Sequence, residues 1–174
     1  MKIILETERL ILREYTPDDF DALFAIVGDA ETMKHYPKPY DERGTKYWID
    51  WSLGHYAQHG FGFWAVILRE TGELIGNCGL TMQNIDGESL PEVGYHIHKN
   101  YWRQGIAKEA ASAVRDWAFE NTDYPALYSY MTKDNEASVK TAASLGMKQT
   151  GAYTDKHYGD MLVYAVAREE WETR

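Results

Sequence analysis

The stretch between residues 101 and 111 has the residue types and spacing that most clearly predict chemistry, and that chemistry is phosphate binding. A strand-like run at residues 92–98 precedes it, and an alanine-rich helical pattern begins at Gly105 and reaches about residue 120. The first amide N–H groups of a helix have no partner inside the helix, and the helix dipole makes that end positive, so a phosphate is the expected ligand. Because Gly105 has no Cβ and Ala107 is small, the backbone can approach such a ligand closely.

Cationic side chains flank this turn, since Arg103 and Lys108 place positive charge at its rim. Each amide that donates to a charged phosphate contributes roughly 1.5–3 kcal/mol, so the main chain from Gln104 to Lys108 is expected to bind a pyrophosphate. An ordinary strand-to-helix turn explains the same local sequence without a ligand. Two other phosphate motifs are excluded, because the sequence has neither the Gly-Lys-Ser/Thr end of a P-loop nor a G-x-G-x-x-G fingerprint.

The segment resembles the cofactor motif of the GNAT superfamily of acetyl-CoA-dependent N-acetyltransferases, Gln/Arg-x-x-Gly-x-Gly/Ala, with Trp102, Gly105 and Ala107 at its fixed positions. Trp102 stands where Gln or Arg is usual. Residues 101–110 are more similar to the bacterial ribosomal-protein N-terminal (alanine-type) acetyltransferases, which read Y-W-x-x-G-x-A-x-E-A. The resemblance covers nearly the whole chain and includes residues 8–13, 135–138, 145–147 and 169–171.

The resemblance implies that acetyl-CoA is the cosubstrate and assigns residues to it. The pyrophosphate would bind a cradle formed by Arg103, Gln104, Gly105, Ile106, Ala107 and Lys108. The pantetheine arm would pair like an extra strand with backbone groups of Ile97 and Tyr95, which lie five and seven residues before Trp102. Asn135 would hydrogen-bond the arm, although this residue type is also typical of a helix N-cap.

Ser138 is the candidate for steadying or protonating the CoA thiolate. Many members of the resembled family have a tyrosine for this purpose seven residues after the Asn, but here that position is Ala142, so the role does not transfer. The resembled branch has Asn-x-x-Ser instead, which matches Asn135 and Ser138. A thiol with a pKa of about 8.5 needs only modest help to leave. A purely structural role for Ser138, as a cap or a packing residue, remains the alternative.

Glu92 is the candidate base for the acceptor amine. An α-amino group with a pKa of about 8 costs only ~1 kcal/mol to deprotonate at pH 7, whereas a lysine costs ~4–5 kcal/mol, so an N-terminal acceptor needs a weaker base. Glu92 lies on the strand expected at residues 92–98 and would act directly, through a water, or by holding the ammonium. An exposed acid at a strand end, beside Pro91, is the alternative interpretation.

Aromatic residues are expected around the acceptor amine. The resemblance implies that the early helices with their connecting loop, and the last hairpin, border the acceptor groove, so Tyr36, His157 and Tyr158 are the candidate substrate contacts. Tyr36, like Trp48 and Trp51, has an alternative interpretation as an ordinary core aromatic residue.

The order of elements predicts one α/β (α+β) domain over residues 1–174. The resemblance implies a GNAT fold with a mixed, mostly antiparallel sheet of about seven strands, splayed between strands 4 and 5 and flanked by about four helices. Strands are expected at 7–15, 61–69, 74–82, 92–98, 126–132, 147–153 and 161–168, and helices from residue 16, at 45–59, at 105–120 and from residue 135 to 145. The parallel crossover between 92–98 and 126–132 would allow the sheet to open there.

Composition limits the partners and the compartment. The 18 basic and 27 acidic side chains give a formal charge of −9, which argues against nucleic acid. No segment is long and apolar enough to cross a membrane. The one cysteine, Cys78, cannot form an internal disulfide, so a reducing cytoplasm is expected. His96 and His98 share a strand face, but no further ligand lies at metal-binding spacing, so no metal is expected.

These observations predict an enzyme that moves an acetyl group from acetyl-CoA directly to a primary amine, with a protein N-terminal α-amine as the favoured acceptor. A small-molecule amine, such as an amino acid, a polyamine or an aminoglycoside, is the alternative acceptor. A CoA-binding regulatory module without turnover is the alternative from another class, and Ala142 leaves it open. A monomer or a homodimer is expected.

Overall fold

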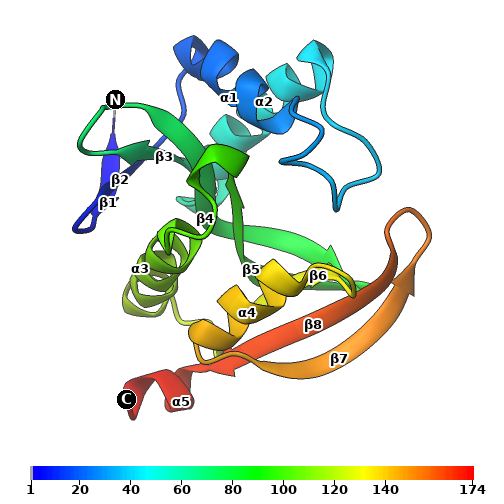
Figure 1. The fold of residues 1–174 in the computed structure, drawn as a ribbon. Helices are drawn as coiled ribbons and strands as arrows, with labels where there is room; N and C mark the ends of the chain where they lie inside the picture. The colour runs from blue at the N-terminus through cyan, green and yellow to red at the C-terminus, as the bar shows by residue number, and fades with distance from the viewer. Residues whose placement is uncertain (1) are drawn as a thin grey trace.

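A mixed β-sheet forms the middle of the computed structural model, which describes residues 2–174 (Figure 1). Within these residues the sheet has eight strands in the order β1-β2-β3-β4-β5-β6-β8-β7. The strands are β1 (Ile3–Glu6), β2 (Leu10–Arg13), β3 (Phe63–Leu68), β4 (Leu74–Ile85), β5 (Glu88–Ile97), β6 (Ala126–Thr132), β7 (Lys148–Asp155) and β8 (Gly159–Ala167). Every neighbouring pair is antiparallel except β5 and β6.

Helices cover both faces of the sheet. They are α1 (Phe20–Val27), α2 (Glu42–His59), α3 (Ile106–Asn121), α4 (Glu136–Ser144) and α5 (Arg168–Glu172), with short 3-10 turns at η1 (Pro17–Asp19) and η2 (Lys99–Tyr101). The expected fold class is therefore confirmed, with two additions. The strand β1 pairs with β2, and the helix α5 follows β8. Both additions are only four or five residues long, so their sequences carry no full period of an apolar pattern.

Local sequence signals explain where the helices start and stop. The helix α2 begins three residues earlier than expected, because the side chain of Asp41 accepts a hydrogen bond from the amide of Gly44 at 2.7 Å and caps it. It ends at Gly60, whose φ of 77° is a left-handed conformation that glycine adopts without strain. This places the aromatic residues of α2 against the sheet.

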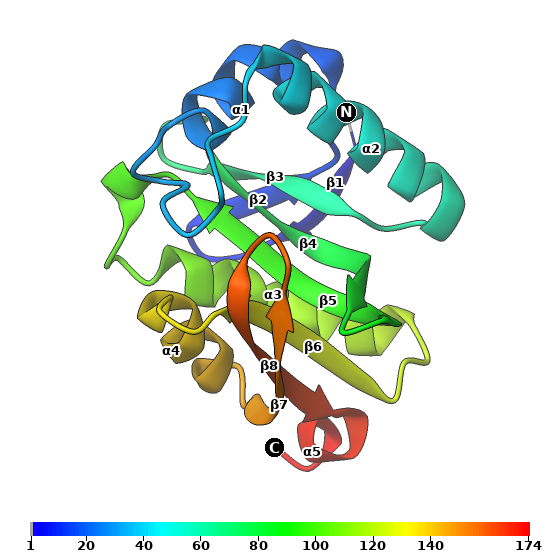
Figure 2. The same ribbon diagram turned by 90° about the vertical axis from the view of Figure 1, so that its right-hand side faces the viewer.

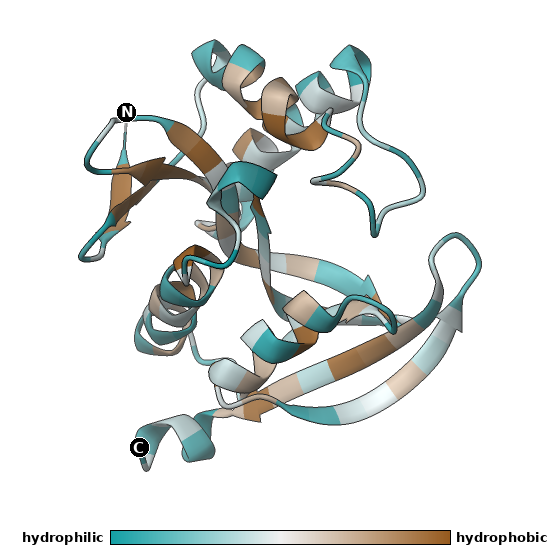
Figure 3. Ribbon diagram, viewed as in Figure 1, coloured by the Kyte–Doolittle hydropathy of each residue, from teal (hydrophilic) through white to brown (hydrophobic). Residues whose placement is uncertain are grey.

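The strand β3 separates two hydrophobic clusters, as expected for a strand that is apolar on both faces. Phe63, Ala65 and Ile67 pack with α1 and α2, whereas Trp64 and Val66 pack with α3 on the opposite face. Figure 3 shows hydrophobic residues along β1, β2, β3 and β8 and in patches on the helices, while the tip of the β7–β8 hairpin and α5 are mainly hydrophilic. Among residues 2–174, no helix combines the length and hydrophobicity that crossing a membrane requires.

The sheet opens between β5 and β6, the two strands that the crossover through α3 connects. Their pairing consists of a single register pair, Glu92 with Tyr128. Beside it, the hydroxyl of Ser129 donates to the carbonyl of Val93 at 2.7 Å. From Gly94 to the end of β5 no residue pairs with β6 within the described residues. This is the opening expected between the fourth and fifth strands. Those strands are β5 and β6 here, because β1 was not among the expected strands.

Candidate active site

The amide groups of the turn before α3 donate to no other group in the described part of the protein. Arg103 and Gly105 both have left-handed backbone conformations, with φ of 59° and 75°, so the chain curls tightly before the helix. The first helical hydrogen bond runs from the amide of Glu109 to the carbonyl of Gly105 at 3.0 Å. Within residues 2–174 no protein group accepts a hydrogen bond from the amides of residues 103–108. These donors, and the positive end of α3, suit a phosphate group.

Arg9 is part of this turn, and sequence reasoning missed it. Its Nη1 donates to the carbonyl of Gln104 at 2.8 Å, and its Nε donates to the carboxylate of Glu109 at 2.6 Å. The backbone amide of Arg9 also donates to Glu109, at 2.9 Å. Arg9 therefore clamps the turn to the loop between β1 and β2 and adds positive charge beside Gly105. About a hundred residues separate the partners, so no local pattern could have indicated the contact.

Trp102, the unusual residue of the motif, ties the turn to the end of β5. Its indole N–H donates to the carbonyl of Ile97 at 2.7 Å, and the ammonium of Lys34 lies 5.0 Å from the centre of its ring. The carbonyl of Val93 faces β6. Backbone groups of alternate residues in a strand point to the same side, so those of Tyr95 and Ile97 face the opening as well. The carbonyl of Ile97 is thus occupied by Trp102, while its amide and the backbone of Tyr95 face the opening.

The N-terminus of α4 borders the other side of the opening. The side chain of Asn135 caps this helix by accepting from the amide of Ser138 at 3.2 Å, which is the structural role that the sequence left open. Both residues also line a cavity between β5 and β6. The hydroxyl of Tyr95 donates to the carbonyl of Ser138 at 3.1 Å and so bridges β5 and α4. Ala142, where a tyrosine is common in the family, is fully buried in the core.

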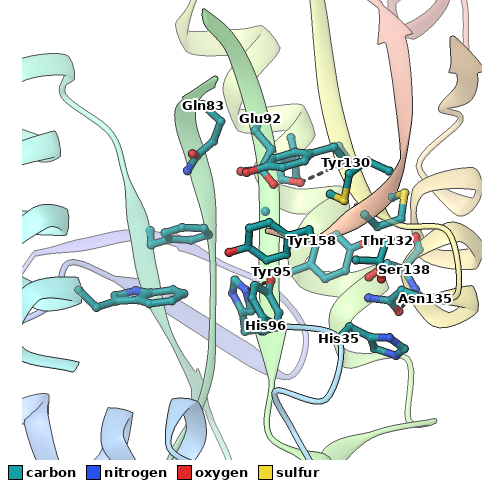
Figure 4. Close-up of a pocket in the computed structure, with 18 of the residues that line it drawn as sticks. His35, Gln83, Glu92, Tyr95, His96, Tyr130, Thr132, Asn135, Ser138 and Tyr158 are labelled. Atoms are coloured by element: carbon teal, nitrogen blue, oxygen red, sulfur yellow. Dashed lines mark hydrogen bonds between the residues drawn. The ribbon is translucent and has the colours of Figure 1, made fainter. Parts of the chain in front are cut away.

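The cavity has a volume of about 290 Å³ and one carboxylate, that of Glu92 (Figure 4). Glu92 is 8 % exposed, and its only hydrogen-bond partner in the described residues is the hydroxyl of Thr81, at 3.1 Å. Burial raises the pKa of Glu92 from 4.5 to about 7, against the opposing effect of the Thr81 hydrogen bond. Glu92 lies in the middle of β5, so the interpretation as an exposed acid at a strand end is wrong. A Cβ on Gly94 would lie 3.0 Å from this carboxylate, so a glycine leaves room for it.

A buried chain of hydrogen bonds lies beside Glu92. The Nδ1 of His96 is 2.8 Å from the side-chain oxygen of Asn77, and its Nε2 is hydrogen-bonded to the hydroxyl of Tyr36. Burial lowers the pKa of His96 to about 4, so the ring stays neutral near pH 7. Sequence reasoning considered His96 only as a metal ligand, and no group of three metal-binding side chains occurs in residues 2–174.

Aromatic rings form most of the remaining wall. The centre of the Trp48 ring lies 5.3 Å from that of Phe63 and 5.1 Å from that of His96. Trp48 also lines the cavity, so it is both a core residue and a lining residue. Trp51 and Tyr130 line the cavity as well. The tip of the β7–β8 hairpin lies beside the loop that precedes α2 in both views of the fold (Figures 1 and 2). There, the ring of Tyr158 meets the ring of Tyr36 edge-on at 6.0 Å.

Two residues that the sequence singled out lie away from the cavity. His157 is at the exposed tip of the β7–β8 hairpin, where its amide donates to Asp155, and it does not belong to the lining of the cavity. Cys78 is fully buried on β4, and burial raises the pKa of its thiol well above the usual range. The polar residues Asn77 and Thr81 on the same strand are equally buried. Two polar residues among the apolar residues at 74–82 were a signal that sequence reasoning overlooked.

Comparison with known proteins places this architecture in a family. Residues 9–148 match the model of the acetyltransferase (GNAT) domain. The chain belongs to the GNAT acetyltransferases. It is 31% identical over 147 residues to the uncharacterized protein YkkB of Bacillus subtilis, covering 84% of this chain and 86% of that protein. This GNAT protein is therefore an acetyl-CoA-dependent acetyltransferase.

Solved structures agree with this assignment. An acetyltransferase from Agrobacterium tumefaciens has 31% sequence identity and a TM-score of 0.80, with 93% of this chain and 92% of that chain covered. RimL, a ribosomal L7/L12 alpha-N-protein acetyltransferase in complex with coenzyme A, has a TM-score of 0.79 at 17% identity, with 97% and 99% covered, which is a likeness of fold. The unoccupied amides before α3 and the opening beside β5 fit CoA as the ligand of this GNAT fold.

Proposed function

We propose that the protein transfers the acetyl group of acetyl-CoA to a primary amine and that the N-terminal α-amine of a protein is the favoured acceptor. The observation that carries this proposal is the position of Glu92, a buried carboxylate at the place where β5 and β6 separate. Asn135 and Ser138 line the same cavity from α4. An acetyl donor in the opening and an amine at Glu92 would therefore meet within one small space.

The main chain would hold the cosubstrate. The amides of residues 103–108 would bind the pyrophosphate, and the backbone groups of Tyr95 and Ile97 that face the opening would bind the pantetheine arm. The bound thioester supplies the activated acetyl group. Ser138 lies at the first turn of α4, where its hydroxyl is available to steady or protonate the leaving thiolate.

Glu92 would prepare the acceptor for attack. With a pKa of about 7, its carboxyl group is about half ionised at neutral pH, so it can hold an ammonium and take a proton from it directly or through a water. The pKa of an α-amino group, about 8, is close to the pKa of Glu92, so this proton transfer costs little free energy. A lysine, with a pKa of about 10.4, would be a poorer match.

A second argument for a protein N-terminus as the acceptor is the similarity of this fold to that of RimL. RimL, whose fold this chain shares, is by its name an α-N-protein acetyltransferase. A small-molecule amine is the second candidate acceptor, because the cavity of about 290 Å³ is walled by aromatic rings and suits a compact ligand. A cytoplasmic location, which the single buried Cys78 favours, belongs to the same proposal.

The proposal is tested by measuring release of the CoA thiol with matched peptides. One peptide has a free N-terminal alanine and no lysine, the second has the same sequence with an acetylated N-terminus, and the third adds an internal lysine to the blocked peptide. We expect thiol release with the first peptide only. Faster reaction of the lysine peptide would contradict the favoured acceptor. Background rates with every peptide and with a panel of small amines, despite tight CoA binding, would identify a non-catalytic CoA-binding module.

A further inference from the structure

We propose that the acceptor cavity accepts only amines without a carboxylate next to the amine, namely simple monoamines and the first residue of a peptide, and that it excludes free α-amino acids. This inference rests on the proposed function, because it concerns the acceptor of the same reaction. It begins from the charges inside the cavity. Glu92 is the only carboxylate in the lining, and within residues 2–174 no lysine or arginine lines it.

The two histidines of the lining do not supply a counter-charge for a carboxylate. His96 is hydrogen-bonded to the neutral side chains of Asn77 and Tyr36, and burial lowers its pKa to about 4, so the ring is neutral. His35 lies at the other end, where its Nδ1 is 3.7 Å from the carboxylate of Asp134. An α-amino acid that placed its ammonium at Glu92 would bring its carboxylate within a few ångströms of a second negative charge, with no cation to offset it.

The hydrogen bonds around Glu92 leave its carboxylate able to accept from an ammonium. Gln83 donates to the hydroxyl of Thr81 at 3.2 Å, and Thr81 donates in turn to Glu92. Thr81 bonds Oε2 of Glu92 alone, so within the described residues Oε1 has no hydrogen-bond partner. An ammonium has three N–H donors to give to such acceptors, whereas a carboxylate has none. The cavity is therefore complementary to the amine and not to an acid beside it.

The aromatic wall adds to the selection. Rings of Trp48, Trp51, Phe63, Tyr130 and Tyr158 line the space around Glu92. Aromatic faces attract a cation and provide apolar contact for a compact carbon skeleton, but they offer nothing to a carboxylate. Figure 4 shows Tyr158 and Tyr95 in the middle of this space, between Glu92 and the Asn135 and Ser138 pair.

A carboxylate farther from the amine has a different environment. A second hollow, lined by residues 36–41, Arg43, Gly44, Tyr47 and Tyr158, shares four tyrosines with the cavity. It contains the cations Lys38 and Arg43 as well as Asp41. A peptide whose first residue fills the cavity could leave along this hollow, so an acid later in the peptide does not meet Glu92.

The experiment compares amines with amino acids of the same skeleton. Phenethylamine and phenylalanine form one pair and isobutylamine and valine form the other. All four amines are more basic than a peptide N-terminus and should react more slowly than it, so kcat/KM is compared only within each pair. We expect kcat/KM to be at least tenfold higher for the amine than for the amino acid, and phenylalaninamide to behave like the amine. Equal or higher kcat/KM for phenylalanine or valine overturns the inference.

A binding measurement separates this inference from the proposed function. Quenching of the tryptophan fluorescence of the protein, to which Trp48 and Trp51 of the cavity contribute, reports binding to the CoA complex without turnover. We expect phenethylamine to bind at least tenfold more tightly than phenylalanine, and the ratio to fall toward one in Glu92→Gln, because the negative charge is gone. A ratio unchanged by Glu92→Gln, or no binding of phenethylamine, overturns the inference. Selective binding without turnover of any amine or peptide would instead remove the proposed function.

Discussion

The cosubstrate turn and the acceptor cavity are built in opposite ways. The turn consists of consecutive residues, 103–108, whose main-chain amides lie at the surface and need only the right backbone angles. The cavity is assembled from side chains of α2, β3, β4, β5, β6 and the β7–β8 hairpin, which meet only after folding. In the proposed function, backbone donors recognise the pyrophosphate that every CoA thioester shares. Side chains from many elements decide which amine is accepted, so the two parts are free to vary independently.

The largest expected effect comes from a Cβ and a charge in the turn. In Gly105→Asp a carboxylate takes the place of the phosphate and two amide contacts of roughly 2 kcal/mol each are lost, so the Kd for CoA should rise by ~10³-fold in isothermal titration calorimetry. Gly105 has a φ of 75°, a conformation that asparagine also tolerates, so Gly105→Asn is the uncharged control and should weaken binding less. An unchanged CoA affinity in folded Gly105→Asp would show that the turn does not bind the cosubstrate.

A change in the cavity should lower kcat and leave CoA binding unchanged. Glu92→Gln keeps the shape but removes the base, so kcat with a peptide acceptor should fall between ~10²-fold and ~10³-fold while the Kd for CoA stays the same. Glu88→Gln, at the exposed start of the same strand, is the matched control and should change neither quantity. A kcat within threefold of the wild type in Glu92→Gln would mean that Glu92 is not the base.

The same substitution should change stability in a pH-dependent way. Because the pKa of Glu92 is raised from 4.5 to about 7 in the folded state, its favourable contribution is complete below pH 4.5 and is lost as the pH rises through about 7. Glutamine has no such loss, so Glu92→Gln should be more stable than the wild type at pH 8 by about 3 kcal/mol, the 2.5-unit shift at ~1.36 kcal/mol per unit, and equally stable near pH 4.

Urea unfolding of both proteins at several pH values measures this difference. The buried His55 and His96, whose pKa values are lowered to about 4, affect both proteins alike and cancel in the comparison. A difference that does not grow with pH would mean that Glu92 ionises without a burial cost. The cavity would then be wet and open, unlike the structure.

The smallest expected effect is at the junction of the two regions. Ser138→Ala removes one hydroxyl near the leaving thiolate, and because a CoA thiol leaves readily, kcat should fall only about threefold to tenfold. Ser144→Ala, at the last turn of the same helix, is the control, since its hydroxyl bonds only the carbonyl of Thr141. A pre-steady-state measurement that finds equal rates of acetyl transfer in both variants would leave Ser138 as a structural residue of the α4 N-terminus.

The site that could be predicted from sequence is the part that depends on neighbours along the chain. Gly105 begins α3 with a left-handed turn, and Asn135 caps α4, as their residue types indicate. At these two helix starts the responsible forces, steric limits on the backbone and hydrogen bonds to nearby amides, act over a few residues. Apolar patterns also predicted the strands β3 to β6, whereas the opening between β5 and β6 was expected from the family resemblance and a crossover that allows it.

Other parts were decided only by the tertiary structure. The contact of Arg9 with Glu109, the burial of Glu92, and the chain from Asn77 through His96 to Tyr36 each join residues far apart in the sequence. The sequence by itself determined a local turn with free main-chain amides, which we propose binds the phosphates of CoA. The fold decided the charge state of Glu92 and the shape of the acceptor cavity, because desolvation and side-chain contact depend on which surfaces the whole chain brings together.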